Sequence, residues 1–200
     1  MLKLAGECIE GQMADHIASL DAHTKDIFEE IRTGEYFYNI GAGTTIALIA
    51  NWLYALPLLL ARDITVDRIA IEVTTAGAAD TDARLGIYSD GTNIQPGALL
   101  LDAGTVDVDS IGIKEITISQ VLTKGRWWLG IVSDGTPTVA GVLREYGATT
   151  GMGIASSNFR RKNGSVYVAH SYAALPDPFG SATLYNGHAP GVLVRVASLD

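Results

Sequence analysis

The sequence contains nearly the same eight-residue segment twice. Leu85–Thr92 (LGIYSDGT) returns as Leu129–Thr136 (LGIVSDGT). In each copy an apolar run stops at Ser-Asp-Gly, a sequence typical of a tight turn at the end of a strand. The copies lie about 44 residues apart, and the lack of a third copy argues against a propeller or a solenoid. We therefore expect both copies to be strands in related places of one β-sandwich.

The rest of the chain after Gly34 also reads as short strands separated by glycine-rich turns. The further strand-like stretches are residues 52–60, 69–74, 99–101, 106–108, 111–119, 166–170 and 192–196. No helical pattern is interleaved with them, and this spacing is typical of a sandwich or jelly roll. The predicted fold is mainly β: a β-sandwich of jelly-roll type preceded by an N-terminal oligomerising α-helix.

Two strands change the side on which their apolar residues fall. Positions 64 and 66 are out of phase with position 69, which predicts a bulge near Asp67. Positions 111 and 113 are out of phase with positions 116 and 118, which predicts a second bulge between them.

A different period marks residues 13–31. Apolar residues there recur at alternating steps of four and three, the spacing of a coiled-coil seam. The seam residues are Met13, Ile17, Leu20, Thr24, Ile27 and Ile31. The pattern predicts an oligomerising helix, and the alternative is an amphipathic helix packed on its own domain, which Phe28 beside the seam favours. We expect a helical stem over residues 1–34 and a β-sandwich domain over residues 35–200.

Composition narrows the classes of protein to consider. The net charge of −8 argues against a nucleic-acid partner, whose phosphates require clustered Lys and Arg. Cys8 is the single cysteine, so the chain cannot form an internal disulfide or a cysteine-based zinc site. With 48% hydrophobic and 18% charged residues, the chain is apolar for a soluble monomer, which predicts an oligomer subunit.

Residues 46–61 form the most apolar stretch, in which Asn51 is the one strongly polar residue. A spanning helix needs about 20 apolar residues, and this stretch is shorter, contains Pro57 and lacks a basic N-terminal flank. The N-terminus also lacks the basic region and continuous apolar core of a secretory signal. We expect neither a membrane span nor a signal peptide.

Asp90 and Asp134 are the candidate metal ligands, because each lies in an Asp-Gly loop near other oxygen donors. Their spacing differs from that of an EF-hand, and Asp before Gly already has a role in the turn. The four histidines form no ligand-spaced pair and do not combine with Cys8. The glycine-rich residues 151–157 lack the Lys of a P-loop. We predict no metal and no cofactor.

Aromatic residues supply the candidate recognition sites. Trp52, Trp127 and Trp128 are candidates for stacking on sugars, and because Trp127 and Trp128 face opposite sides of a strand, at most one is core if the sheet has one solvent-exposed face. Residues 172–190 are irregular and rich in Pro and Gly, so we expect them to tolerate change and to contact a receptor; plain loop packing is the alternative. The candidate receptor-binding residues are Tyr172, Phe179, Tyr185 and His188.

Several segments carry a further likeness: residues 53–57 (LYALP), 64–69 (ITVDRI), 83–90 (ARLGIYSD), 96–97 (PG), 101–104 (LDAG) and 128–135 (WLGIVSDG). Together they resemble a β-sandwich domain carried by fibre, spike and tail proteins of tailed bacteriophages. The resemblance implies a virion component, commonly a trimer in which a helical stem leads into β-domains. These motifs are turns and strand ends, so they indicate the fold more clearly than the function.

The sequence therefore predicts a non-enzymatic structural protein of a tailed-phage virion, a fibre, spike or tail component that contributes to host adsorption. The expected partners are further copies in a homotrimer, other virion proteins and a host-surface glycan. The chain lacks a Ser, His and Asp set in a nucleophile context, which argues against catalysis. The alternative function is a carbohydrate-binding accessory domain of a larger assembly.

The seam also predicts that the stem sets the oligomeric state. Replacing Ile17→Asp together with Ile27→Asp should shift the mass measured by light scattering towards the monomer, because charged seam positions oppose burial. An unchanged β signature in circular dichroism is the folding control. An unchanged oligomer would show that contacts of the β-domain hold the subunits together without the stem.

Overall fold

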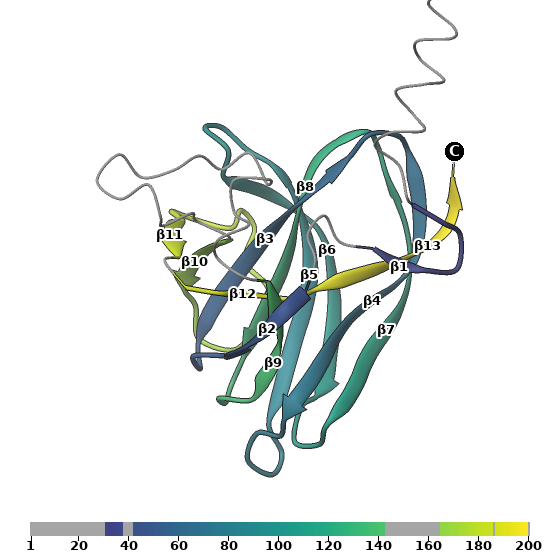
Figure 1. Ribbon diagram of the computed structural model, residues 1–200. Coiled ribbons are helices and arrows are strands. Elements are labelled where there is room, and N and C mark those ends of the chain that lie inside the picture. The colour runs from purple at the N-terminus through teal and green to yellow at the C-terminus, as the bar shows by residue number, and fades with distance from the viewer. Residues whose placement is uncertain (1–30, 38–41, 143–164, 186, 200) are drawn as a thin grey trace, which may run out of the picture. The chain divides into compact units, whose positions relative to one another are not determined.

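The computed structural model describes residues 31–37, 42–142, 165–185 and 187–199. The chain divides into two compact units, Met1–Arg32 and Thr33–Asp200, and the strands all belong to the second (Figure 1). The seam residues of the predicted stem lie outside the described residues except for Ile31, so the oligomerising helix stays a prediction. Within the described residues, no helix is long and apolar enough to cross a membrane.

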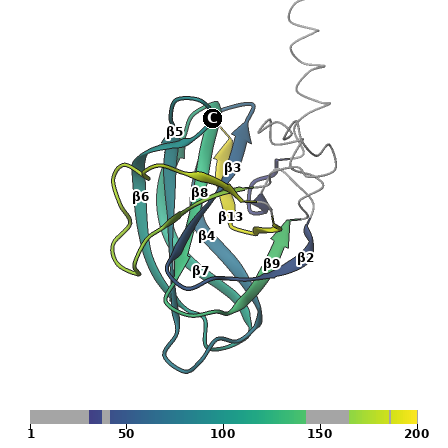
Figure 2. The same ribbon diagram turned by 90° about the vertical axis from the view of Figure 1, so that its left-hand side faces the viewer.

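The described strands form two antiparallel sheets, so the fold is mainly β (Figures 1 and 2). Sheet A follows the order β1-β13-β4-β9-β12, with β2 paired to β9 and β7 paired to β4. Its strands are β1 (Tyr36–Phe37), β2 (Ala42–Ala47), β4 (Ile64–Thr75), β7 (Gly112–Leu122), β9 (Thr138–Val142), β12 (Ala189–Pro190) and β13 (Leu193–Leu199). Sheet B follows the order β11-β10-β3-β8-β5-β6. Its strands are β3 (Trp52–Leu60), β5 (Asp82–Asp90), β6 (Pro96–Asp107), β8 (Gly125–Ser133), β10 (Ser165–Ala169) and β11 (Thr183–Tyr185).

The central strands of sheet B are buried on both faces, which is clearest in β3, where every residue from Leu53 to Leu58 is buried. One face meets sheet A, where Leu56 packs with Val142 and Ala189. The other face lies under residues 171–182, which we call the strap. The cluster between strap and sheet consists of Leu53, Ala55, Tyr88, Trp128, Val132, Val166, Leu175 and Phe179. Burial on two sides explains why the apolar run in β3 does not alternate with polar residues.

The two copies of the repeated sequence are neighbouring antiparallel strands, β5 and β8, and Gly86 lies opposite Gly130. The copies are thus related by a local twofold axis through this glycine pair. A Cβ atom on Gly86 would lie 2.2 Å from Cδ1 of Leu175 and 2.6 Å from the carbonyl oxygen of Leu101. A Cβ atom on Gly130 would lie 3.1 Å from the ring of Tyr88. Packing above the sheet therefore requires both glycines.

The bulge predicted near Asp67 is confirmed. Strand β4 advances two residues, from Val66 to Arg68, while its partner β13 advances one, so Asp67 is the extra residue. Such a bulge bends the strand and shifts the phase of its side chains, as the apolar pattern of β4 indicated.

The second predicted bulge is wrong. Residues 112–117 of β7 pair with β4 without a break in register, and the register shifts only beyond Thr117. Ile111 and Ile113 are out of phase because they lie on the exposed side, with 71% and 68% of their surface accessible.

Asp90 and Asp134 both serve the fold through their carboxylates. Asp90 Oδ1 accepts a hydrogen bond from Trp128 Nε1 at 2.9 Å, and Arg126 lies 3.6 Å from its other oxygen. Asp134 Oδ1 accepts a hydrogen bond from the backbone N–H of Asp82 at 2.9 Å. Among the described residues, no group of three or more His, Cys, Asp or Glu side chains is placed to hold a metal ion. These contacts favour a structural role for both residues.

The glycine pair generates a stability prediction. Gly86→Ala should lower the free energy of unfolding by about 1–3 kcal/mol, because the added methyl group meets the backbone of Leu101, which cannot move aside without breaking the ladder. Gly130→Ala should cost less, since the facing ring of Tyr88 has only to give by a few tenths of an ångström. Urea unfolding monitored by tryptophan fluorescence measures both, and the reverse order of the two effects would contradict this packing.

Candidate functional site: an aromatic pocket on sheet B

Four aromatic side chains gather where β3, β10 and β11 pair side by side. Trp52 and Tyr54 belong to β3, Tyr167 to β10 and Tyr185 to β11. Alternate residues of a strand share a face. Tyr167 lies opposite Tyr54, and Tyr185 lies opposite Ser165, two positions along from Tyr167. The register therefore brings all four rings to one face of sheet B.

The four rings pack against each other in defined geometries. Trp52 stacks on Tyr167 with centroids 4.1 Å apart and planes 7° from parallel. Tyr185 approaches edge-on, 5.2 Å from Tyr54 and 5.8 Å from Tyr167. Each such pair contributes about 0.5–1.5 kcal/mol beyond its buried area. These ring contacts thus add to the three residue pairs that join the short strand β11 to β10.

These rings border a shallow pocket of about 290 Å³. Its lining residues are Trp52, Tyr167, Leu184, Tyr185 and Gly187. Leu184 is 45% exposed, and Gly187 has no room for a side chain, since a Cβ atom there would lie 2.5 Å from the ring of Tyr185. None of these described lining residues carries a charged side chain. The pocket therefore offers flat apolar surfaces with phenolic hydroxyls at their edges.

Tyr54 forms the buried base of the aromatic cluster. Its ring is fully buried, and burial raises the pKa of its hydroxyl, with the neighbouring Tyr185 adding to the effect. The phenol is therefore neutral at physiological pH, and its ring holds the more exposed rings in place.

The structure separates the four predicted receptor-binding residues. Tyr185 lines the pocket, and His188 lies half-buried just beyond it in the sequence. Tyr172 is half-buried against the cluster under the strap. The prediction for Phe179 is wrong, because its ring is only 1% exposed and meets Tyr88 edge-to-face at 5.1 Å. Phe179 is a core residue and has no surface to offer a receptor.

The strap is also fastened by polar contacts. The backbone N–H of Leu175 donates to Asp102 at 3.0 Å, and Asp102 accepts a hydrogen bond from Arg84 at 2.7 Å. Asp177 accepts a hydrogen bond from the backbone N–H of Leu99 at 2.9 Å. Burial alone would raise the pKa of Asp102, but the hydrogen bonds from Arg84 and Leu175 outweigh it and lower the pKa. The expectation that residues 172–190 tolerate change is therefore wrong for the strap.

Sequence reasoning singled out Trp52 and Tyr185 but missed Tyr167 and Leu184. Tyr167 lies in a stretch that was predicted to be a strand, and Trp52 and Tyr54 alternate as residues on one face do. The missing information was the pairing of β10 with β11 and with β3, of which the second joins residues more than 100 positions apart. Of the tryptophan pair, Trp128 is buried and Trp127 is half-buried.

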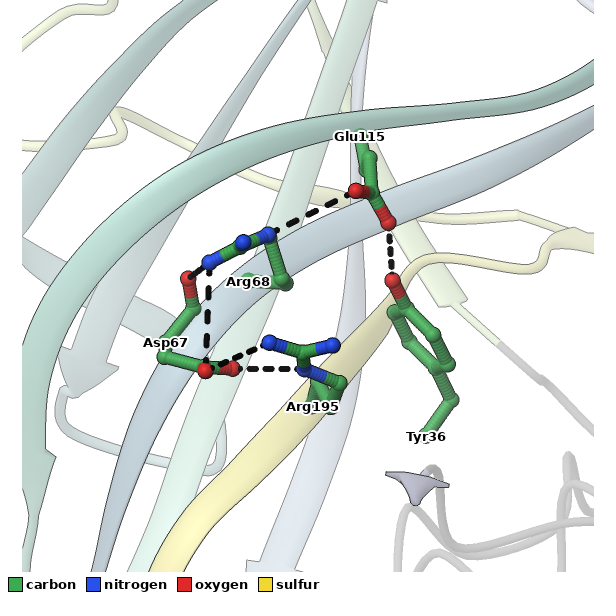
Figure 3. Close-up of polar contacts among 5 residues, drawn as sticks. All are labelled: Tyr36, Asp67, Arg68, Glu115 and Arg195. Atoms are coloured by element: carbon green, nitrogen blue, oxygen red, sulfur yellow. Dashed lines mark hydrogen bonds and ion pairs between the residues drawn. The ribbon is translucent and has the colours of Figure 1, made fainter. Parts of the chain in front are cut away.

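A second cluster of polar residues lies on the exposed face of sheet A, around the bulge (Figure 3). Arg195 donates to both carboxylate oxygens of Asp67, at 2.8 and 2.6 Å. Arg68 lies 3.5 Å from Glu115, and the hydroxyl of Tyr36 donates to the same carboxylate. The cluster joins β1, β4, β7 and β13.

The charges of this cluster stabilise one another. Hydrogen bonding from Arg195 lowers the pKa of Asp67, and hydrogen bonding from Tyr36 lowers the pKa of Glu115. Because both carboxyl pKa values are lowered in the folded state, their contribution to stability is complete at neutral pH and is lost as the pH falls through those lowered values. Each ionised group already has an opposite partner, so we interpret the cluster as structural.

Comparison with known proteins leaves the family open. No family model matches the chain, and no curated protein matches it. One similar solved structure is the clostridial cysteine protease Cwp84 after propeptide cleavage, at 14% identity and a TM-score of 0.46, covering 80% of this chain and 40% of that one. Another contains the cysteine protease and lectin-like domains of Cwp84, a surface layer associated protein of Clostridium difficile, at 15% identity and a TM-score of 0.41, covering 72% and 32%. The chain spans less than half of either, and both scores are too low to support a conclusion.

The burial of Phe179 generates a prediction about the strap. Phe179→Ala should lower the free energy of unfolding by about 3–5 kcal/mol, because it empties a fully buried aromatic site. Tyr185→Ala should cost less, since that ring is half-exposed. Equilibrium unfolding in urea compares the two. A Phe179→Ala variant as stable as the parent would show that the strap does not close the core.

Proposed function

We propose that the chain is a non-enzymatic structural protein of a tailed-phage virion, a fibre, spike or tail component that contributes to host adsorption. The placement on a virion rests on the sequence resemblance over residues 50–140. The adsorption role rests on one observation, the uncharged aromatic pocket lined by Trp52, Tyr167 and Tyr185. The proposal includes a jelly-roll form of the two-sheet fold, an N-terminal oligomerising helix and assembly as a homotrimer with other virion proteins.

The ligand that suits this pocket is a host-surface glycan. A sugar ring has apolar C–H faces, which can cover aromatic rings, and hydroxyl groups, which can bond to the phenols of Tyr167 and Tyr185. The volume of about 290 Å³ lies just below the usual range for ligand pockets, which fits one sugar ring better than a long oligosaccharide.

A shallow site of this size binds weakly on its own. Copies held together on one particle strengthen attachment, because each later contact forms at a high effective concentration. A homotrimer with one pocket per copy therefore fits the proposed role, in which the strength of attachment depends more on the number of binding sites than on the affinity of each site.

The alternative, a carbohydrate-binding accessory domain of a larger assembly, is favoured by the same pocket. Both functions use the same contact with a glycan and differ in where the protein resides. A micrograph of assembled phage particles with this subunit labelled separates them: labels on a fibre, spike or tail support the virion role, and unlabelled particles support the accessory domain.

The pocket generates a prediction about attachment. Leu184→Asp should weaken binding on a glycan array and to host cells by about tenfold or more, because it introduces a charge at a residue that lines the uncharged pocket. The fold should survive, since the Leu184 side chain is 45% exposed and the ladder of β11 uses only its backbone.

Leu59→Asp is the matched control. Leu59 is 48% exposed on β3 in the same sheet but does not line the pocket. The control should bind like the parent. Equal binding by a folded Leu184→Asp variant would place recognition elsewhere on the particle.

A further inference from the structure

The exposed face of sheet A carries an apolar groove of about 180 Å³ between β1, β4, β7 and β13. Its lining residues are Tyr36, Ala70, Ile71, Glu72, Ile113 and Leu193. Ile113 stands at the groove with 68% of its surface exposed, and Ile111, 71% exposed, precedes it. One face thus presents both an apolar hollow and protruding aliphatic side chains, which lower the free energy when they are covered.

Most charges beside this groove are paired, and Glu72 adds one exposed carboxylate to its lining. Asp67 and Glu115 are paired with Arg195 and Arg68 on the same face (Figure 3). This cluster has no net charge, whereas the whole chain carries −8. Copies of an acidic protein repel each other least where their surfaces are locally neutral. The groove is therefore suited to contact another copy of the chain.

The course of the chain favours the same occupant. Tyr36 lines the groove and belongs to β1, which follows the last seam residue, Ile31, by five positions. Five residues of extended chain reach at most about 18 Å. Stems that associate through the seam would therefore hold the β1 segments of neighbouring copies near one another.

We propose that the groove on sheet A is a contact between copies of this chain, in which the groove of one copy receives Ile113 of β7 and the preceding Ile111 from the next. Each copy carries both the groove and Ile113, and in a homotrimer the contact between them is heterologous and closes into a ring. The inference rests on the proposed homotrimer and adds the surface through which the β-domains meet. The contact is small, so it acts together with the stem.

The test uses the full chain, with light scattering and sedimentation followed over a dilution series. Ile113→Asp should raise the concentration at which the oligomer dissociates by about tenfold or more, because the charge would have to enter an apolar groove. Ile113→Thr, which keeps a β-branched residue in the strand, should shift the same midpoint less and in the same direction.

Val121→Asp is the matched control, because Val121 is 54% exposed on the same strand and does not line the groove. It should dissociate like the parent. Equal dissociation of the two Asp variants and the parent would overturn the proposed contact, as would a parent chain that is monomeric at every concentration. Either result leaves glycan binding by single copies intact, whereas loss of the Leu184→Asp effect with normal oligomers would overturn the adsorption role alone.

Discussion

The central strands of sheet B are buried on both faces, and the side chains that bury them come from distant parts of the chain. Sheet A covers one face, and the strap covers the other with Leu175 and Phe179. A sheet closed on both sides needs apolar residues at successive positions, which is why β3 is continuously apolar. It also needs room above its centre, which the glycine pair provides. Burial on both faces thus accounts for three features together: the strap, the glycine pair and the continuously apolar sequence of β3.

This packing also positions the aromatic pocket. The face of β3 that carries Leu56 into the core between the sheets carries Tyr54 and Trp52 as well, because alternate residues share a side. Tyr54 is fully buried, while Trp52 is only partly covered. The pocket therefore lies at the margin of the main core, where rings are held from beneath and open above. Binding sites benefit from such support, since rigid rings lose little entropy when a ligand covers them.

Strands, turns and one bulge could be predicted from the sequence because they depend on local alternation. The phase change at Asp67 identified a real bulge. The similar change at Ile113 did not, because an apolar residue can also be out of phase when it is simply exposed. Phe179 was misplaced for a related reason: an irregular segment rich in Pro and Gly looks like a surface loop whether or not it covers a sheet. The pairing of β10 with β3 and β11, which creates the pocket, depends on contacts that no local pattern contains.

The one internal difference between the two copies of the repeat explains how the strap finds its place. The local twofold axis through Gly86 and Gly130 relates Tyr88 to Val132, the fourth residue of each copy. Tyr88 lies over Gly130 and fills the space there with its own ring. The smaller Val132 leaves the corresponding space over Gly86 open, and Leu175 of the strap occupies it. A tyrosine at position 132 would fill the space over Gly86 with its own ring. The smaller valine leaves that space to Leu175, so the strap packs against only one of the two symmetry-related glycines.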